Sequence, residues 1–157
     1  MRRPCASLSC ASELILPDAN LLLYAIDERS VRHEAAKGWL ESTLSGTETV
    51  AFAWLVLLAF VRLSTRAAVF ENPLDADTAL DYLDEWLERS CATVVHPTGR
   101  HAALLRELLH HLGTAGNLTT DAHLAALAIE HGATLHSCDA DFSRFPGLQW
   151  VDPLARR

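Results

Sequence analysis

Short apolar runs alternate with longer amphipathic stretches along the chain. The short runs predict buried strands at residues 14–16, 50–53, 93–95 and 133–138, with a fifth candidate at 148–151. The longer stretches have helical spacing and predict helices at residues 20–27, 33–44, 54–66, 75–88, 101–112 and 121–131, with a loop at 114–120. Strands that alternate with helices of about a dozen residues indicate parallel βαβ units. The predicted fold is therefore α/β: a three-layer α/β/α sandwich with a mostly parallel five-stranded sheet.

The length of the chain, 157 residues, suits one domain that buries its core without disulfides. Two arginines open the sequence, but no apolar stretch of about 7–15 residues follows them, so the start does not match a secretory signal. We expect residues 1–13 to be a ragged extension and residues 14–157 to be a single domain. No apolar run approaches the roughly 20 residues that span a bilayer, so we expect no membrane partner.

The four cysteines form no CxxC pair. Cys5 and Cys10 lie in the expected extension, whereas Cys91 and Cys138 lie beside apolar segments and are expected to be buried thiols. This usage favours a reducing, cytoplasmic compartment over a disulfide framework.

The formal net charge of −7 argues against a protein that coats nucleic acid through bulk positive charge. It does not argue against a nuclease, because clustered carboxylates repel one another until a divalent cation neutralises them. Contact with RNA would then depend on a local basic patch or on the metal.

Three aspartates occupy equivalent places in the predicted architecture. Asp18 follows the first strand, Asp139 follows the fourth, and Asp121 opens the helix that leads into the fourth. The carboxyl ends of parallel strands line one edge of a sheet, so we expect these side chains to converge there. Oxygen ligands suit Mg²⁺, which activates water and stabilises charge at phosphorus. Each aspartate alone also fits a helix cap or a turn, but capping does not explain why all three fall on one edge.

Other kinds of site have less support in the sequence. Of the eight histidines, His110 and His111 are adjacent and point apart on a helix, and no HExxH or paired Cys/His spacing occurs. Neither GxGxxG nor GxxxxGK[ST] is present. Asp18-Ala-Asn lacks the second aspartate of a phosphatase DxD pair. Zinc binding, nucleotide binding and haloacid-dehalogenase chemistry are therefore disfavoured.

Three segments resemble motifs of a known family. The segment LPDANLLLY at 16–24 resembles the first motif of PIN domains. GNLTTDAHLAALA at 116–128 resembles the helix of VapC-type toxins that carries their third acid. SCDADF at 137–142, followed by FPGL at 145–148, resembles their strand-four motif. The order and spacing fit from residue 14 onward, so the chain resembles the VapC-type toxin ribonucleases of type II toxin–antitoxin systems.

The resemblance implies a PIN-like five-stranded sheet and a Mg²⁺- or Mn²⁺-dependent endoribonuclease that cleaves RNA such as tRNA. It also implies a homodimer and neutralisation by a VapB-type antitoxin. By the same resemblance, metal binding and catalysis fall to Asp18, Asp121 and Asp139, and hydrogen-bonding support falls to Asn20 and Ser137. Large apolar residues at 20–44 and 54–66 belong either to the core or to a groove for the antitoxin.

The sequence departs from the family pattern at one acidic position. PIN domains carry a glutamate on the helix after the second strand, and here that position is Ala59. Asp141 matches a more variable acidic position. Arg62 is expected either to contact phosphate in the pocket or to be a surface arginine. Two alternatives remain open: a degenerate PIN domain that binds RNA or a protein partner without cleaving, and a different metal-dependent phosphohydrolase.

Overall fold

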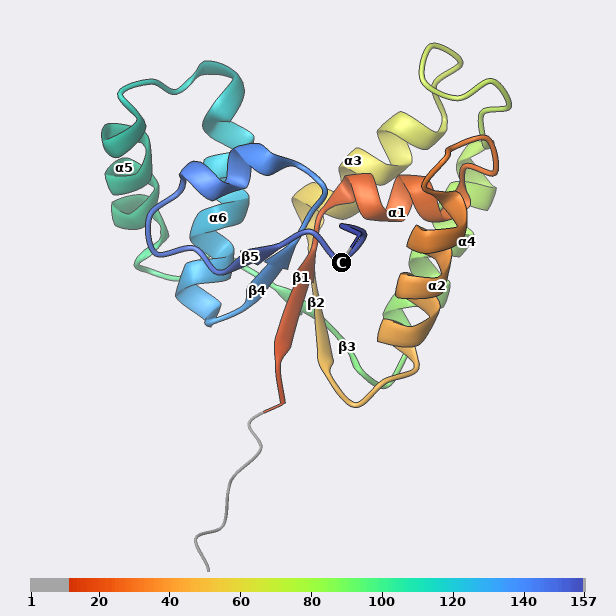
Figure 1. The fold of residues 1–157 in the computed structure, drawn as a ribbon, viewed down its shortest axis with the longest axis horizontal. Helices are drawn as coiled ribbons and strands as arrows, with labels where there is room; N and C mark the ends of the chain where they lie inside the picture. Colours follow the sequence, from red (N-terminus) through yellow and green to blue (C-terminus); the bar gives the residue numbers. More distant parts are fainter. Residues whose placement is uncertain (1–11, 157) are drawn as a thin grey trace, which may run out of the picture.

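The computed structural model describes residues 12–156, which form a single five-stranded sheet flanked by helices (Figure 1). The strands are β1 (Leu14–Pro17), β2 (Thr49–Ala53), β3 (Ala92–Val95), β4 (Thr134–His136) and β5 (Trp150–Val151). Their order is β3-β2-β1-β4-β5, and each neighbouring pair is parallel. The predicted α/β fold is confirmed. Most of the extension expected at 1–13, with Cys5 and Cys10, lies outside the described residues.

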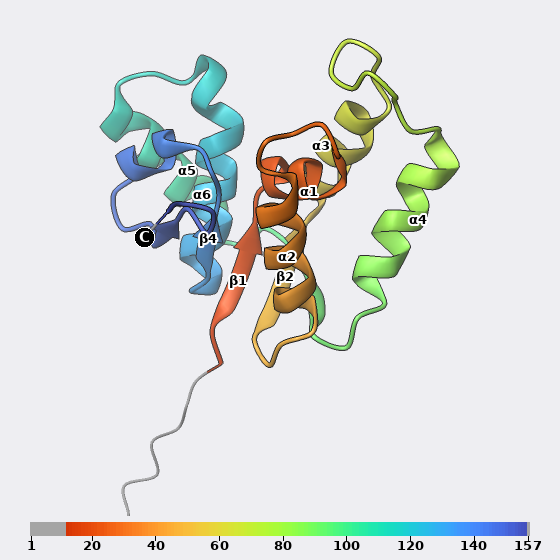
Figure 2. The same ribbon diagram turned by 45° about the vertical axis from the view of Figure 1, so that its right-hand side comes forward.

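Helices cover both faces of the sheet. They are α1 (Ala19–Ile26), α2 (His33–Leu44), α3 (Trp54–Ser64), α4 (Ala76–Leu87), α5 (His101–Leu112) and α6 (Thr119–His131). Two short 3₁₀ helices, η1 (Gly116–Leu118) and η2 (Ala140–Arg144), precede α6 and follow β4. Figures 1 and 2 show α5 and α6 on one side of the sheet and α1–α4 on the other. None of the helices within residues 12–156 is long and apolar enough to cross a membrane.

The two helical layers follow from the direction of the crossovers. Right-handed connections from β1 to β2 and from β2 to β3 place α1–α4 on one face. The chain then returns from β3 to β4 on the far side of β1, so α5 and α6 fall on the opposite face. The strand order therefore reverses between β1 and β4. Ligands of open α/β sheets bind at such a switch point, outside the carboxyl ends of the strands.

An aromatic cluster joins α3 and α4 to the sheet. Phe60 packs edge-on against Trp86 with ring centroids 4.7 Å apart, and Phe52 of β2 stacks on the same indole at 6.3 Å. All three side chains are buried, and truncating Phe60 to alanine would cost about 3–5 kcal/mol of stability. In contrast, Trp54 and Leu58 on α3 are 46% and 60% exposed. The large apolar residues of this helix are therefore divided between core and surface.

Three local details differ from the sequence-based expectation. β4 is shorter than expected, from Thr134 to His136, although Ser137 N–H still donates to Val151 O at 3.0 Å. The expected loop at 114–120 contains η1, whose Leu118 N–H bonds to Ala115 O, and the turn leads straight into α6 at Thr119. Cys91 and Cys138 are half-buried and free rather than fully buried.

Candidate metal centre

Asp18 stands at the point where β1 passes into α1. Its backbone N–H donates to His136 O at 2.9 Å and so extends the pairing of β1 with β4 by one residue. Its carboxylate Oδ1 accepts from Ala19 N–H at 2.7 Å and caps α1. Capping uses only one carboxylate oxygen, so the helix-cap and metal-ligand interpretations of Asp18 are compatible.

Two polar side chains hold the other oxygen of Asp18. Ser137 Oγ donates to Asp18 Oδ2 at 2.7 Å, and Asn20 Nδ2 donates to the same oxygen at 3.0 Å. Ser137 Oγ in turn accepts from Asp139 N–H at 3.0 Å. The structure thus brings together four of the residues expected in the site. Asn20 and Ser137 lie where they orient Asp18, and Ser137 also fixes the backbone of Asp139.

Burial raises the pKa of Asp18 above its ordinary value, and the hydrogen bonds from Ser137 and Ala19 oppose this rise. The negative charge of Asp139 raises the pKa further. Repulsion from Asp139 therefore adds to the free-energy cost of ionising Asp18, and a bound cation would remove that repulsion.

Asp121 is the third residue of α6, not its first, and no side chain caps this helix. Its partly buried carboxyl has a pKa of about 6, raised first by burial and then by the charges of Asp139, Asp18 and Asp141. A carboxyl that senses three like charges belongs to a set of acids whose mutual repulsion favours a divalent cation. Helix capping does not account for Asp121.

A cleft of about 120 Å³ opens between α3 and α6 at the carboxyl end of β1. Asp18 and Asp121 line it together with Thr120, and Ala59 and Arg62 line it from α3. The structure therefore places Ala59, the position of the missing glutamate, beside two of the expected acids. Thr120 was not anticipated as a lining residue, although its place next to Asp121 in the motif was a usable signal.

Asp139 and Asp141 lie in the turn after β4. Asp139 Oδ1 accepts from Asp141 N–H at 2.9 Å, and Asp141 lies 3.9 Å from the Arg144 guanidinium. Asp141 is exposed, and Asp139 is half-buried. Both contribute negative charge at Asp121, but neither lines the cleft between α3 and α6.

The donors available at this site are carboxylate oxygens, which fit a hard divalent cation better than zinc. Within the part of the chain that the structure describes, no three His, Cys, Asp or Glu side chains are gathered closely enough to enclose an ion by themselves. Mg²⁺ does not need such a cage, since it takes one or two carboxylates and keeps several waters. The raised pKa of Asp121 is consistent with a site whose charge a cation would balance.

The chain belongs to the PIN-domain family, whose model matches residues 15–148. Among proteins of known name, it is 48% identical to ribonuclease VapC37 of Mycobacterium tuberculosis over 138 residues, which cover 88% of this chain and 96% of that protein. It is 40% identical to ribonuclease VapC33 of the same species over 141 residues, which cover 90% and 99% of the two chains. The resemblance inferred from the three motifs is confirmed.

Solved structures show the same fold at lower identity. VapBC2 from Rickettsia felis, bound to a DNA fragment from its promoter, matches with a TM-score of 0.65 and 22% identity, over 88% of this chain and 97% of that one. VapC20 of M. tuberculosis, described as a sarcin–ricin loop cleaving toxin, matches with a TM-score of 0.62 and 20% identity, over 86% and 98%.

Proposed function

We propose that this chain is the toxin of a VapBC-type toxin–antitoxin system and cleaves RNA as a divalent-metal-dependent endoribonuclease. The observation that carries the proposal is the shared cleft of Asp18 and Asp121 at the switch point of the sheet, with Asp139 adding like charge. The relatives named as VapC ribonucleases, which align over nearly their whole length, support the same function.

In this proposal Asp18 and Asp121 from the cleft and Asp139 from the turn after β4 would hold Mg²⁺ or Mn²⁺, with waters completing its coordination. The bound ion supplies activation of water and stabilisation of charge at phosphorus. Asn20 and Ser137 restrict the Asp18 carboxylate to one orientation through its Oδ2 atom. This restriction lowers the cost of ordering the carboxylate when an ion and a substrate phosphate arrive.

Arg62 supplies positive charge to the RNA within the cleft. Its guanidinium is exposed, and no ion pair to an acidic side chain engages it within residues 12–156. A guanidinium presents several donors in a planar fork that matches the oxygens of a phosphate. We assign Arg62 to holding the substrate backbone beside the acids. Structured RNA such as tRNA, in the cytoplasm, is the substrate class that we expect.

A groove of this chain that suits a VapB-type antitoxin lies on the face of the sheet that carries α1–α4. A cleft of about 240 Å³ lies among α1, α2 and α4. Its lining is apolar at Leu40 and Trp86, basic at Lys37 and Arg89, and acidic at Glu28, Glu41 and Glu85. An amphipathic segment of the antitoxin would place its apolar side chains there. A second copy of the chain would cover Trp54 and Leu58, which are one helical turn apart on α3 and exposed.

The proposal is tested by incubating the purified chain with total RNA and defined tRNAs in the presence of Mn²⁺. We expect metal-dependent cleavage that disappears in Asp121→Asn and persists in Asp77→Asn, a matched substitution on the exposed face of α4. Cleavage by Asp121→Asn at the wild-type rate would refute the assignment of the site.

The second candidate function is that of a degenerate PIN domain that binds RNA or a partner without cutting. The observation that favours it is Ala59, which lines the cleft where the family carries a glutamate. Calorimetry with Mn²⁺ distinguishes the two. No heat and no thermal stabilisation at millimolar Mn²⁺ would favour the non-enzymatic candidate.

A further inference from the structure

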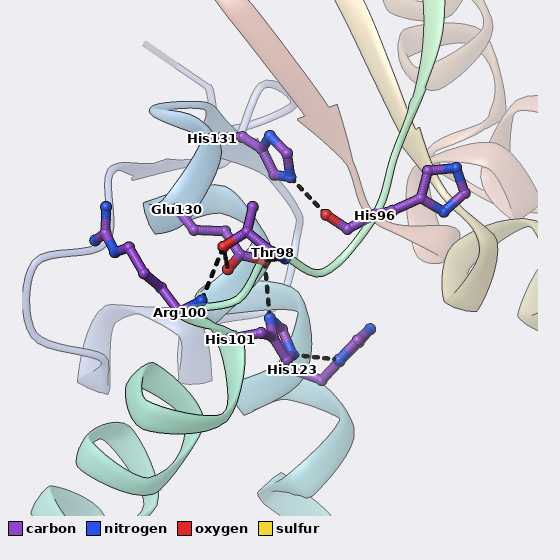
Figure 3. A network of polar contacts seen from close by, with 7 residues as sticks. All are labelled: His96, Thr98, Arg100, His101, His123, Glu130 and His131. Atoms are coloured by element: carbon purple, nitrogen blue, oxygen red, sulfur yellow. Dashed lines mark hydrogen bonds and ion pairs between the residues drawn. The ribbon is translucent and has the colours of Figure 1, made fainter.

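A chain of polar contacts, part-buried at its His101 end and exposed at Thr98, ties α6 to the segment that precedes and opens α5, residues 96–101 (Figure 3). Glu130 Oε1 accepts from His101 Nδ1 at 2.9 Å, and the other ring nitrogen of His101, Nε2, lies 2.8 Å from His123 Nδ1. Thr98 donates its hydroxyl to Glu130 Oε2 at 2.8 Å and its backbone N–H to Oε1 at 3.3 Å. The Glu130 side chain is fully buried.

The Glu130 carboxylate fixes one proton on His101, and for a neutral His101 ring it also fixes the tautomer of His123. Burial opposes ionisation of Glu130, but the bonds from Thr98 and His101 outweigh it and lower the pKa of the carboxyl, so Glu130 is an acceptor at neutral pH. His101 must therefore carry a proton on Nδ1, and in the neutral ring its Nε2 is an acceptor. It follows that His123 donates from Nδ1 and keeps a lone pair on Nε2.

The polar stripe of α6 lies on the side of the helix opposite the candidate site. His123 and Glu130 are seven residues apart, which brings them to one stripe and separates them by about 10 Å along the axis. Asp121 precedes His123 by two residues, or about 200° around the helix. The same short helix thus presents Asp121 to the cleft and His123 to α5.

Small side chains make up most of the buried apolar surface of α6. Four of its six buried apolar residues are alanines, and only Leu124 and Leu127 are large. A smooth surface of small side chains permits close approach but supplies few knobs that fix the angle about the helix axis. Buried hydrogen-bonded groups can provide such registry, because they are satisfied in one arrangement only.

We propose that Glu130, His101 and His123 form a positioning relay that fixes the rotation of α6 and so the direction of the Asp121 carboxylate. This inference rests on the proposed function, because it assumes that Asp121 is a metal ligand. A rotation of about 10° moves a group about 5–6 Å from the helix axis by about 1 Å. Such a displacement costs on the order of 100-fold in rate at a reacting centre. His101 and His123 act through Asp121 and touch no substrate.

The experiment is NMR spectroscopy of the metal-free chain labelled at histidine nitrogens and at aspartate carboxyl carbons. We expect the ring proton on Nδ1 in both His101 and His123. Replacing His101 by Asn keeps a donor for Glu130 but removes the contact to His123. We expect this variant to shift the Asp121 carboxyl signal and to weaken Mn²⁺ binding about tenfold.

The matched control is His111→Asn, the same substitution on an exposed position of α5, which leaves both readouts unchanged. A proton on Nε2 of His123, or an Asp121 signal and Mn²⁺ affinity unaffected by His101→Asn, overturns the relay. If His101→Asn does not fold, Thr98→Val on the exposed segment is the second variant, because it loses one hydrogen bond to Glu130. It must shift the Asp121 carboxyl signal and weaken Mn²⁺ binding, as expected for His101→Asn. No change in either quantity overturns the relay. Failure of the wild-type chain to cleave RNA or bind Mn²⁺ contradicts the proposed function instead, because the Asp121 signal is read without metal.

Discussion

Ser137 donates its hydroxyl hydrogen to Asp18 at 2.7 Å across 119 residues of sequence. The pairing of β1 with β4 brings the two residues together, because each lies just past the end of its strand. The contact therefore marks the switch point of the sheet and orients a carboxylate there.

Ser137→Ala tests the orientation of Asp18. Ser137 is fully buried, and its loss leaves the Asp139 N–H without its acceptor. We expect Mn²⁺ affinity to fall about 10- to 100-fold and the free energy of unfolding to fall by about 1–3 kcal/mol. Calorimetry and urea unfolding measure the two effects. Ser143→Ala, which removes an exposed hydroxyl bonded only to Ala140 O, is the control. Unchanged Mn²⁺ affinity in Ser137→Ala would show that this contact does not support the site.

Asp121→Asn is expected to stabilise the metal-free protein while it removes activity. The folded-state pKa of about 6 lies above the ordinary 3.8, so the folded chain binds this proton more tightly than the unfolded chain. Stability from that proton is present below about pH 4 and is lost as the pH rises through 6. At pH 7.5 we expect a gain on the order of 1 kcal/mol in Asp121→Asn, after allowance for solvent screening. Urea unfolding measures this gain in the free energy of unfolding, which should shrink towards pH 4.5. If Asp121→Asn were less stable than the wild type at pH 7.5, burial and repulsion by the other aspartates would not destabilise the ionised Asp121.

Ala59→Glu restores an acid to the cleft beside Asp18 and Asp121. A further carboxylate oxygen should tighten Mn²⁺ binding about tenfold. It should also lower the stability of the metal-free protein at neutral pH, because it adds a like charge. Ala59→Gln adds the same bulk without the charge and serves as the control in calorimetry. Equal Mn²⁺ affinities for the two variants would place residue 59 outside the reach of the ion.

Arg62→Ala is expected to act on the substrate rather than on the metal. Loss of a charge-assisted contact to phosphate should raise KM for RNA about tenfold and leave Mn²⁺ affinity unchanged. The salt dependence of RNA binding should also become shallower. Arg66→Ala, which removes an exposed arginine two residues beyond the end of the same helix, should change KM less. Equal effects of the two substitutions would assign Arg62 to nonspecific surface charge.

Hydrophobic periodicity was sufficient to predict the sheet and the edge at which the aspartates meet. Parallel connectivity follows from alternating strands and helices, and it brings Asp18 and Asp139 to one edge whatever the details of packing. The start of α6 could not be predicted in this way. A turn from Ala115 to Leu118 begins the helix without a side-chain cap, so Asp121, which has the sequence context of a cap, lies inside the first turn.

The relay between α5 and α6 was also beyond prediction from sequence. His101, His123 and Glu130 each fit an ordinary helical pattern, and nothing in their spacing links the two helices. Their contact depends on how α5 and α6 pack on one face of the sheet, which is a tertiary property. Two of the eight histidines, the buried His101 and the half-buried His123, therefore form a hydrogen-bonded pair that their spacing did not indicate.

The proposed function requires that Asp18, Asp121 and Asp139 hold a divalent ion without which the chain does not cleave RNA. The most direct measurement follows single-turnover cleavage of a defined RNA as Mn²⁺ is titrated, with Mn²⁺ binding determined on the same samples. We predict that cleavage by the wild-type chain rises with metal occupancy and is absent in chelator, and that Asp121→Asn neither binds Mn²⁺ tightly nor cleaves. Cleavage in chelator, or cleavage by Asp121→Asn that equals that of the wild type, would contradict metal-dependent catalysis at these aspartates.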